Sequence, residues 1–279
     1  MSYQELWCRL AKVYDEGEAK AIARMVYEVR YGLSLSDLLM GRDDKVPQDE
    51  LEQMARRLEK QEPVQYVLGE TVFCGHPFYV NRHVLIPRPE TAELCRWITD
   101  DKSGGQCTVL DIGTGSGCIA VTLAAEMPEA EVTAWDISEE ALEVARANAI
   151  RNHVNVTFEQ VDILKAPTTH HPTPNTHHLD IIVSNPPYIC HQEQTTMEQN
   201  VLDYEPHTAL FVPDDDPLLF YRAIATYALT SLKEDGWLYF EINPFYVESL
   251  ADMLSKMSYH DVEIKNDQYG KQRMIKAQR

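Results

Sequence analysis

Strand-like and helix-like patterns alternate along this chain from residue 89 to its end, and that alternation constrains the fold more than any other feature. Thr108–Ile112 and Glu131–Trp135 are short apolar runs, whereas Cys118–Glu126 and Glu139–Arg151 have the character of helices. Such apolar runs are typical of parallel strands that are buried on both faces. We therefore predict an α/β fold, with a mostly parallel sheet covered by helices on both sides. The other elements expected here are strands at 154–158, 180–184, 237–241, 261–264 and 273–276, and helices at 217–232 and 247–257.

The first part of the chain has a helical pattern throughout. Apolar residues recur at three- and four-residue spacing among charges, first at Leu6, Leu10 and Val13, then within Ile22–Val29. Gln48–Lys60 is a further amphipathic stretch. This spacing places apolar side chains on one side of each helix, so the sequence predicts a small helical domain with its own core.

Between these two regions the pattern changes to β-type alternation. Thr71–Phe73, Phe78–Val80 and His83–Ile86 read as three short strands, with turns at Gly75–Pro77 and Asn81–Arg82. This pattern is typical of a hairpin. We therefore expect three parts, which are a helical domain at 1–65, a β-hairpin linker at 66–88 and a larger α/β domain at 89–279.

Charge and cysteine content narrow the class of protein. The formal net charge is −19, whereas proteins that bind nucleic acid phosphates usually carry a surplus of Lys and Arg. A basic protein or a cationic small molecule is the better partner for such a surface. We find no basic-then-apolar leader and no apolar run of membrane-spanning length. The six cysteines include no Cys-x-x-Cys pair, so we expect a cytoplasmic protein with reduced thiols, no membrane segment and no direct nucleic-acid partner.

A glycine loop follows the first strand of the α/β region. Glycines stand at 113, 115 and 117, directly before a helix, and Cys118 occupies the place where a dinucleotide fingerprint needs Gly or Ala. Asp136 ends the next strand, where a carboxylate can bind both ribose hydroxyls, although Asp136 alone also fits a helix cap. Asp162–Ile163 ends the third strand, where an adenine edge could be read. The predicted cofactor site therefore consists of Gly113, Thr114, Gly115, Ser116, Gly117, Asp136, Asp162 and Ile163, together with Asn185.

Asn185–Tyr188, with the sequence Asn-Pro-Pro-Tyr, directly follows the expected strand at 180–184. Each proline fixes its own φ and restricts the residue before it, so the backbone carbonyls are aimed in advance. Asn185 offers an oxygen acceptor and an NH2 donor, and Tyr188 offers a flat wall with a polar tip. The segment suits the holding of a weakly nucleophilic planar nitrogen while an electrophile is delivered to it. A Pro-rich turn without such a role is the alternative interpretation.

A strand, a glycine loop and then one acid at the end of each of the next two strands is an order that resembles the class I S-adenosylmethionine-dependent methyltransferases. A cationic sulfonium donor without phosphate requires carboxylates and close backbone approach rather than Lys or Arg. Asn185–Tyr188 is similar to the motif of methyltransferases that act on planar sp² nitrogens, which leaves adenine, guanine and glutamine acceptors open. In such enzymes Asn185, Pro186 and Tyr188 would be the catalytic residues.

The flanking segments resemble the release factor glutamine methyltransferase (HemK/PrmC) family over nearly the whole chain. The resemblance lies in Glu62–Gly69, Val84–Thr91, Asn185–Ile189, Tyr204–Pro206 and residues 267–273. It implies transfer of a methyl group from S-adenosyl-L-methionine to the side-chain nitrogen (N5) of the glutamine in the Gly-Gly-Gln loop of bacterial class I peptide chain release factors. It also implies that the helical domain helps to grip the factor.

The resemblance also implies which residues bind the substrate. The predicted substrate site contains Asn185, Pro186, Pro187, Tyr188 and Arg88, and we expect Arg88 to face this site rather than to pair with Glu90. We expect no metal ion and a monomeric protein. Two other functions stay open, namely a nucleic-acid amino-group methyltransferase acting on adenine N6 or guanine N2, which the charge disfavours, and an inactive scaffold.

Several features depart from the family pattern or invite other interpretations. Ala92 follows Thr91, so that Glu93 comes one place later than the usual acid, and Val212–Pro217 replaces a glycine-rich stretch. Tyr204–Pro206 fits either a pocket wall or a helix start. The histidine pairs at 170–171 and 177–178 lie in a Pro- and Thr-rich segment without carboxylates, which favours a solvated loop over a metal site.

Overall fold

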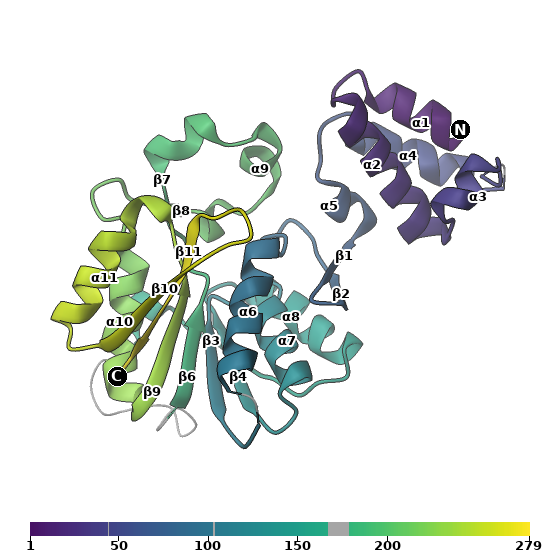
Figure 1. Ribbon diagram of the computed structural model, residues 1–279. Coiled ribbons are helices and arrows are strands. Elements are labelled where there is room, and N and C mark those ends of the chain that lie inside the picture. Colours follow the sequence, from purple (N-terminus) through teal and green to yellow (C-terminus); the bar gives the residue numbers. More distant parts are fainter. Residues whose placement is uncertain (44, 103, 167–178) are drawn as a thin grey trace.

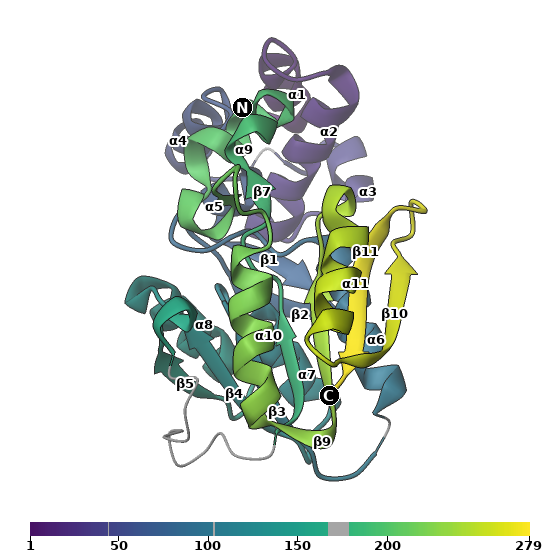
Figure 2. The ribbon, with the colours of Figure 1, turned by 90° about the vertical axis from the view of Figure 1, so that its left-hand side faces the viewer.

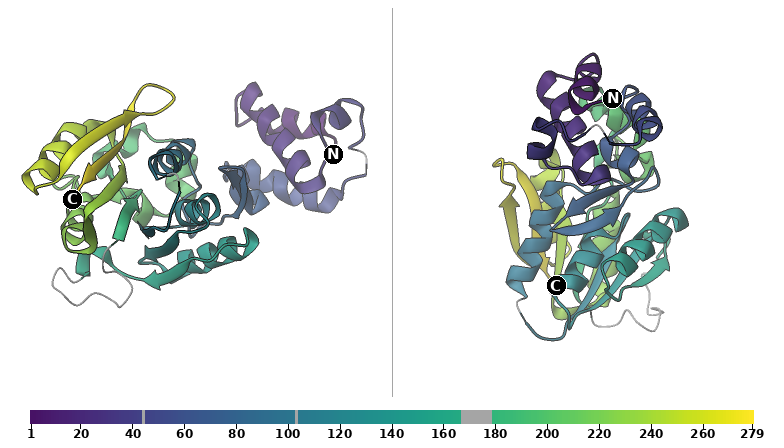
Figure 3. Two further views of the ribbon diagram at one scale, coloured as in Figure 1. Left: turned by 60° about the horizontal axis from the view of Figure 1, so that its bottom comes forward. Right: turned by 90° about the vertical axis from the view of Figure 1, so that its right-hand side faces the viewer.

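The computed structural model describes residues 1–43, 45–102, 104–166 and 179–279. A cluster of helices at the N-terminus lies to one side of a larger α/β part, and a short hairpin lies between them (Figure 1). The view from below in Figure 3 separates the same two bodies.

The larger part is built on a seven-stranded sheet with the order β10-β11-β9-β6-β3-β4-β5. Five strands are parallel to one another, and β11 pairs antiparallel with both β9 and β10. The strands are β3 Thr108–Ile112, β4 Glu131–Asp136, β5 Thr157–Gln160, β6 Leu179–Ser184, β9 Leu232–Glu241, β10 His260–Asn266 and β11 Gln272–Gln278. This mostly parallel sheet confirms the α/β fold expected from the alternating pattern.

Helices cover both faces of the sheet, as Figure 1 shows and as Figure 2 shows for the side of α10 and α11. Neighbouring strand residues serve opposite faces, so Val109 packs with α6 and α7 while Leu110 packs with α10. The helices are α6 Pro89–Asp101, α7 Cys118–Glu126, α8 Glu139–Arg151, α10 Leu219–Ser231 and α11 Val247–Lys256. The bounds of α7 and α8 are those predicted from the sequence.

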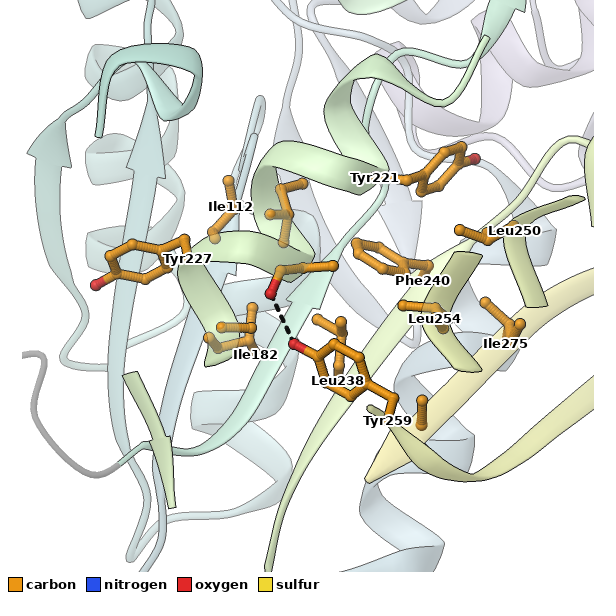
Figure 4. Packing of buried hydrophobic residues seen from close by; sticks show 14 of the residues in the cluster. Ile112, Ile182, Tyr221, Tyr227, Leu238, Phe240, Leu250, Leu254, Tyr259 and Ile275 are labelled. Atoms are coloured by element: carbon orange, nitrogen blue, oxygen red, sulfur yellow. Dashed lines mark hydrogen bonds between the residues drawn. The ribbon is translucent and has the colours of Figure 1, made fainter. Parts of the chain in front are cut away.

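The core under α10 and α11 is almost entirely apolar. Figure 4 shows Phe240 and Leu238 of β9 packed between Ile182 of β6 and the helices. The Tyr259 hydroxyl, which is buried, donates a 2.8 Å hydrogen bond to the carbonyl of Ala225 on α10. This packing fixes β9, whose last residue, Glu241, lies at the carboxyl edge of the parallel strands.

The N-terminal helices enclose a separate core that includes Leu6 and Leu10. The described helices are α1 Tyr3–Leu10, α2 Glu16–Met25, the π-helical turn η1 Val26–Arg30, α3 Leu35–Leu39 and α4 Gln48–Leu58. Two residues of the expected apolar stripe, Val13 and Val29, are exposed. Val13 lies beyond the end of α1, and Val29 lies in η1, whose wider turn shifts the register of the helix face.

The linker differs in part from the expected hairpin. It begins with a short helix, α5 Val64–Leu68, and continues with β1 Glu70–Phe73 and β2 His76–Tyr79, which are antiparallel. The turn is therefore at Cys74 and Gly75, both at positive φ, and not at Gly75–Pro77. Residues 76 and 77 belong to β2 because they pair with Phe73 and Val72.

The third strand predicted at His83–Ile86 is wrong. This segment is irregular, although Val84 and Ile86 are buried. Its backbone groups bond to side chains instead of a neighbouring strand. The Val84 carbonyl accepts from the Tyr66 hydroxyl at 2.6 Å, and the Ile86 N–H donates to Glu205 at 3.1 Å. Apolar alternation alone does not distinguish these two situations.

Smaller differences concern element bounds. β5 begins at residue 157 instead of 154, where Thr157 pairs with Thr133 of β4, and β9 extends back to residue 232. The remaining elements are short: η2 Ile163–Lys165, β7 Ile189–Cys190, η3 His191–Thr196, α9 Gln199–Tyr204, η4 His207–Ala209, β8 Phe211–Val212 and η5 Pro244–Tyr246. None of the helices in the described ranges is long and apolar enough to span a membrane.

Candidate active site

The predicted site residues meet at the carboxyl edge of the parallel strands. β3 lies between β4 and β6, so the connections from β3 and from β6 run in opposite directions. In α/β sheets such a reversal opens a crevice beyond the strand ends. The Ser184 hydroxyl, at the end of β6, donates a 2.6 Å hydrogen bond to the Ile112 carbonyl at the end of β3. The glycine loop and Asn185 are thereby held side by side.

The glycine loop follows β3 and is tied to β4. The N–H groups of Gly113 and Thr114 donate to the Trp135 carbonyl at 2.8 and 2.9 Å, and the Gly115 N–H donates to Asp136 at 2.8 Å. Gly113, Gly115 and Gly117 all have positive φ, which favours glycine at these positions. A Cβ on Gly113 or Gly115 would meet no described atom within 4 Å, whereas one on Gly117 would lie 3.0 Å from the Ala145 Cβ. The first two glycines therefore border open space, and the third permits close packing of α7 on α8.

Asp111 lies beneath this loop and is fully buried. Its Oδ2 accepts hydrogen bonds from the Thr114 hydroxyl at 2.6 Å and from the Ala120 N–H at 3.2 Å. Its Oδ1 has no partner among the described residues, and neither has the hydroxyl of Ser116. Burial raises the pKa of Asp111 to about 7. A phosphate group beside the loop would raise this pKa further through charge repulsion, so a buried acid at this place disfavours a phosphate ligand.

The two acids at the ends of β4 and β5 have different surroundings. Asp136 accepts from the Gly115 and Ser138 N–H groups, and Ser138, not Asp136, caps α8. Each Asp136 oxygen keeps a lone pair for a ligand hydroxyl. Asp162 caps η2 by accepting from the Leu164 N–H at 3.0 Å, and its ion pair with Lys165 lowers its pKa.

Two buried side chains, Thr91 and Glu241, hold Asn185 through a chain of hydrogen bonds. Its Nδ2 donates to the Thr91 hydroxyl at 3.2 Å, and that hydroxyl donates to Glu241 at 2.5 Å. The Tyr188 hydroxyl donates to the other oxygen of Glu241 at 3.1 Å. Burial raises the pKa of Glu241, while the bonds from Thr91 and Tyr188 and the charge of Arg273 oppose that rise. We call Thr91, Asn185, Tyr188 and Glu241 the Asn185 network.

A pocket of about 210 Å³ opens in front of this network. Asn185, Pro186, Tyr188, Glu241 and Arg88 line it on one side. The remaining lining residues are mainly apolar and come from the linker, from β7 and from the segments around α9 and η4: Leu85, Ile189, Met197, Glu198, Val201, Ala209 and Leu210. A small pocket with apolar walls and a few polar groups suits one short, uncharged side chain.

Arg88 pairs with Glu205 at 2.5 Å, and not with Glu90. The Glu205 carboxylate is almost completely buried and also accepts from the Ile86 N–H at 3.1 Å. Tyr204 ends α9, and its hydroxyl donates to the Lys60 carbonyl at 2.8 Å. The Tyr204–Pro206 segment therefore joins two short helices, because Tyr204 ends α9 and Pro206 is the N-cap of η4. The expected helix start is confirmed at η4, and the Glu205 side chain also connects this segment to the linker.

Comparison with known proteins identifies the family to which the chain belongs. Residues 5–69 match the model of the PrmC N-terminal domain, and residues 93–205 match that of the methyltransferase small domain. The chain is 43% identical to the release factor glutamine methyltransferase of Flavobacterium psychrophilum, over 96% of this chain and 94% of that protein. It is 45% identical to the protein of the same name in Bacteroides thetaiotaomicron, over 97% and 96% respectively.

The chain belongs to the release factor glutamine methyltransferase family. Among solved structures, the hMettl16 catalytic domain in complex with the MAT2A 3′UTR hairpin 6 has a TM-score of 0.57 at 14% identity, covering 93% of this chain and 81% of that one. At this identity the likeness concerns the fold alone.

The structure shows where the two departures from the family pattern lie. Glu93 lies away from the pocket, because its carboxylate accepts from the Gln268 N–H at 3.1 Å, in the turn between β10 and β11. Val212 belongs to β8, and the Asp214 carboxylate that follows accepts from the Gln192 N–H at 2.9 Å. Both segments thus contribute to loop structure around the site.

Sequence reasoning missed the polar groups that support Asn185–Tyr188. The sequence pattern indicates Thr91 only as part of a motif and Glu241 only as the end of a strand. Asn243, which is buried and donates to the Tyr188 carbonyl at 3.0 Å, was not considered. A detectable signal was the charge of Glu241 at the end of an otherwise apolar strand, since a buried charge requires partners.

No cluster of His, Cys, Asp and Glu with the geometry of a metal site exists among the described residues. The histidine pairs at 170–171 and 177–178 lie outside those residues. All six cysteines are described and are free thiols.

Proposed function

We propose that this protein methylates the side-chain amide nitrogen (N5) of the glutamine in the Gly-Gly-Gln motif of bacterial class I peptide chain release factors, with S-adenosyl-L-methionine as the methyl donor. The observation that carries the proposal is the Asn185 amide, whose NH2 group is bound to Thr91 so that its oxygen is left for the pocket. A pocket of about 210 Å³ matches one amide side chain better than a nucleobase pocket with aromatic walls on both sides.

The glycine loop and the acids beside it would hold the donor. Gly113–Gly117 lets a ligand approach the backbone, Asp136 would accept the two ribose hydroxyls, and Asp162–Ile163 would border the adenine. The buried Asp111 beneath the loop disfavours a phosphate group at this place and is compatible with a donor that has none. The donor supplies a methyl group on a positively charged sulfur, which makes that methyl group electrophilic.

Asn185–Tyr188 would hold the acceptor. The Asn185 oxygen and the Pro186 carbonyl would accept the two amide N–H groups of the glutamine, while Pro187 and Tyr188 would flank its plane. These bonds strengthen as positive charge develops on nitrogen, so they stabilise the transition state more than the ground state. The nitrogen lone pair forms the new N–C bond, the C–S electron pair stays with sulfur, and the nitrogen then loses a proton to water.

Arg88 would contribute to substrate binding from the pocket wall, where Glu205 fixes its guanidinium. Residues 1–65 would grip the release factor as a separate recognition domain. The net charge of −19 supports a basic protein partner and disfavours direct binding of nucleic acid. We propose a monomeric, cytoplasmic enzyme, for which light scattering of the purified protein tests the oligomeric state.

A methyl-transfer assay tests the function. Tritiated S-adenosylmethionine is incubated with the protein and either a purified release factor or the same factor with the Gly-Gly-Gln glutamine changed to alanine. We expect label on the first factor only. Equal labelling of both, or label on DNA or ribosomal RNA but on neither factor, would contradict the proposal.

A further inference from the structure

The Thr91 hydroxyl lies between Asn185 and Glu241 and bonds to both. Thr91 comes from the first turn of α6, Asn185 follows β6, and Glu241 ends β9. Thr91 and Glu241 are each 2% exposed. Neither side chain bonds to bulk solvent at that exposure, so the direction of each hydrogen bond is set by the protein.

With Glu241 ionised, the donors and acceptors in this arrangement permit one direction. Both oxygens of Glu241 accept from a hydroxyl, Thr91 on one side and Tyr188 on the other, which fits a carboxylate that can only accept. The single hydroxyl proton of Thr91 is thereby used, so Thr91 can only accept from Asn185. Asn185 must then present its NH2 group to Thr91 and its oxygen elsewhere.

The opposite orientation of the Asn185 amide would defeat the proposed function. It would direct an NH2 group at a substrate nitrogen that is itself an N–H donor, and two donors cannot bond to each other. In the observed orientation no described residue donates to the Asn185 oxygen, and Asn185 lines the pocket. The oxygen is therefore available to an N–H donor in that pocket.

We propose that Thr91 and Glu241 are positioning residues, which fix the Asn185 amide with its oxygen toward the acceptor nitrogen. The same carboxylate holds the Tyr188 ring against the pocket. The Glu241 backbone is itself fixed, because its carbonyl accepts a 3.1 Å hydrogen bond from the buried Tyr221 hydroxyl. This inference rests on the proposed function for the identity of the acceptor, but not for the hydrogen bonds.

The first test compares Thr91→Val, which removes the hydroxyl, with Thr91→Ser, which keeps it. Thr99→Val is the control, since Thr99 lies on the same helix and its hydroxyl, among the described residues, bonds only to the Arg96 carbonyl. We expect Thr91→Val to lower kcat about 10- to 100-fold. In Thr91→Val, the KM for the release factor and the Kd for S-adenosylmethionine should stay within about threefold of the unaltered protein. Thr91→Ser and Thr99→Val should both retain most of kcat.

Glu241→Leu provides a second arm, because it removes the acceptor to which the Thr91 hydroxyl donates and so frees the direction of that hydroxyl. Alone it should lower kcat as Thr91→Val does. Combined with Thr91→Val, the loss should be well below the product of the two single losses, since Glu241 reaches Asn185 through Thr91. Any further loss reflects the missing contact between Glu241 and Tyr188. Losses that multiply, or a Thr91→Ser variant as slow as Thr91→Val, would overturn the inference.

A measurement without turnover separates this inference from the proposed function. In a ¹⁵N-labelled protein, the Asn185 side-chain amide protons, assigned by their loss in Asn185→Asp, should exchange with water slowly in the unaltered protein and in Thr91→Ser. They should exchange faster in Thr91→Val. Equal exchange in all three would refute the network, whereas an unaltered protein that labels no release factor would refute only the proposed function.

Discussion

The Ser184 hydroxyl donates a 2.6 Å hydrogen bond to the Ile112 carbonyl, across the boundary between β6 and β3. Ser184 is fully buried and immediately precedes Asn185, while Ile112 immediately precedes Gly113. A single bond therefore connects the segment proposed to bind the acceptor with the loop proposed to bind the donor. Methyl transfer requires these two sites to be aligned along one line, and that alignment depends on such contacts.

Ser184→Ala should disturb that alignment. Loss of the hydroxyl leaves the Ile112 carbonyl without this partner, and we expect the free energy of unfolding to fall by about 1 kcal/mol. The value of kcat should fall more than the affinity for S-adenosylmethionine. Ser255→Ala, which removes an exposed hydroxyl bonded within α11 at 2.9 Å, is the control. Denaturant unfolding, calorimetry and a methyl-transfer assay measure the stability, the affinity and kcat in turn, and an unchanged kcat would contradict the expectation.

Arg88→Ala should be costly because it leaves Glu205 buried without its charged partner. Removal of one member of a well-buried pair costs roughly 3–5 kcal/mol, and the partial exposure of Arg88 reduces this to about 1–3 kcal/mol. The matched control is Arg146→Ala, whose ion pair with Glu139 lies on the surface and should contribute less than about 1 kcal/mol.

Activity of the same Arg88→Ala variant tests the site role of Arg88. Because Arg88 lines the pocket, we expect KM for the release factor to rise. The double variant Arg88→Met with Glu205→Gln should recover stability without recovering KM. If Arg88→Ala methylates the release factor with the kcat and KM of the unaltered protein, Arg88 has no role in the substrate site.

Asp111 should make the unliganded protein less stable as the pH rises toward neutrality. Burial raises its pKa to about 7 in the folded state, from an ordinary value of 3.8. Its contribution is therefore fully present below the unfolded pKa of 3.8 and is lost as the pH rises through about 7, at up to about 1.4 kcal/mol per pH unit. The difference in unfolding free energy between the unaltered protein and Asp111→Asn should decline over this window.

Asp216 provides a control of opposite sign. Its hydrogen bond with Arg222 lowers its pKa, so its contribution is present above the unfolded pKa and is lost as the pH falls. Urea unfolding of the unaltered protein, Asp111→Asn and Asp216→Asn from about pH 2 to pH 8 gives both trends, because the Asp216 contribution changes only below its unfolded pKa of 3.8. Parallel curves for the unaltered protein and Asp111→Asn would show that Asp111 keeps an ordinary pKa.

Gly117→Ala and Gly115→Ala should separate packing from ligand approach. Both glycines have positive φ, at 78° and 54°, and a Cβ at 117 would also meet Ala145. We expect Gly117→Ala to lose well over 1 kcal/mol of stability, and Gly115→Ala to lose about 1–2 kcal/mol. The Gly115 variant should nevertheless bind S-adenosylmethionine markedly more weakly, because the added methyl group occupies the open side of the loop. Calorimetric binding with thermal unfolding distinguishes the two effects.

The order of strands and helices could be predicted because it depends on local patterns. The apolar runs at 108–112 and 181–183 are buried on both faces, and α7 and α8 begin and end where the sequence indicates. The prediction failed at His83–Ile86, whose apolar alternation is that of a strand but whose backbone bonds to Tyr66 and Glu205. Long-range side-chain contacts decided that segment.

The site could be predicted as far as its motifs extend. Asn185–Tyr188 and the glycine loop were found because each is a continuous segment with a recognisable spacing. The groups that orient Asn185 were not found, because Thr91 lies 94 residues from Asn185 and Glu241 lies 150 residues from Thr91. The sheet order places β9 next to β6, and the packing of α6 against β9 adds Thr91.

The most direct test of the central claim is a fragmentation mass spectrum of a release factor after incubation with this protein and S-adenosylmethionine. The account predicts one added methyl group, located on the side chain of the Gly-Gly-Gln glutamine, and none when Asn185→Ala replaces the unaltered protein. A methyl group on another residue, or an unmodified factor beside a protein that binds S-adenosylmethionine, would contradict it.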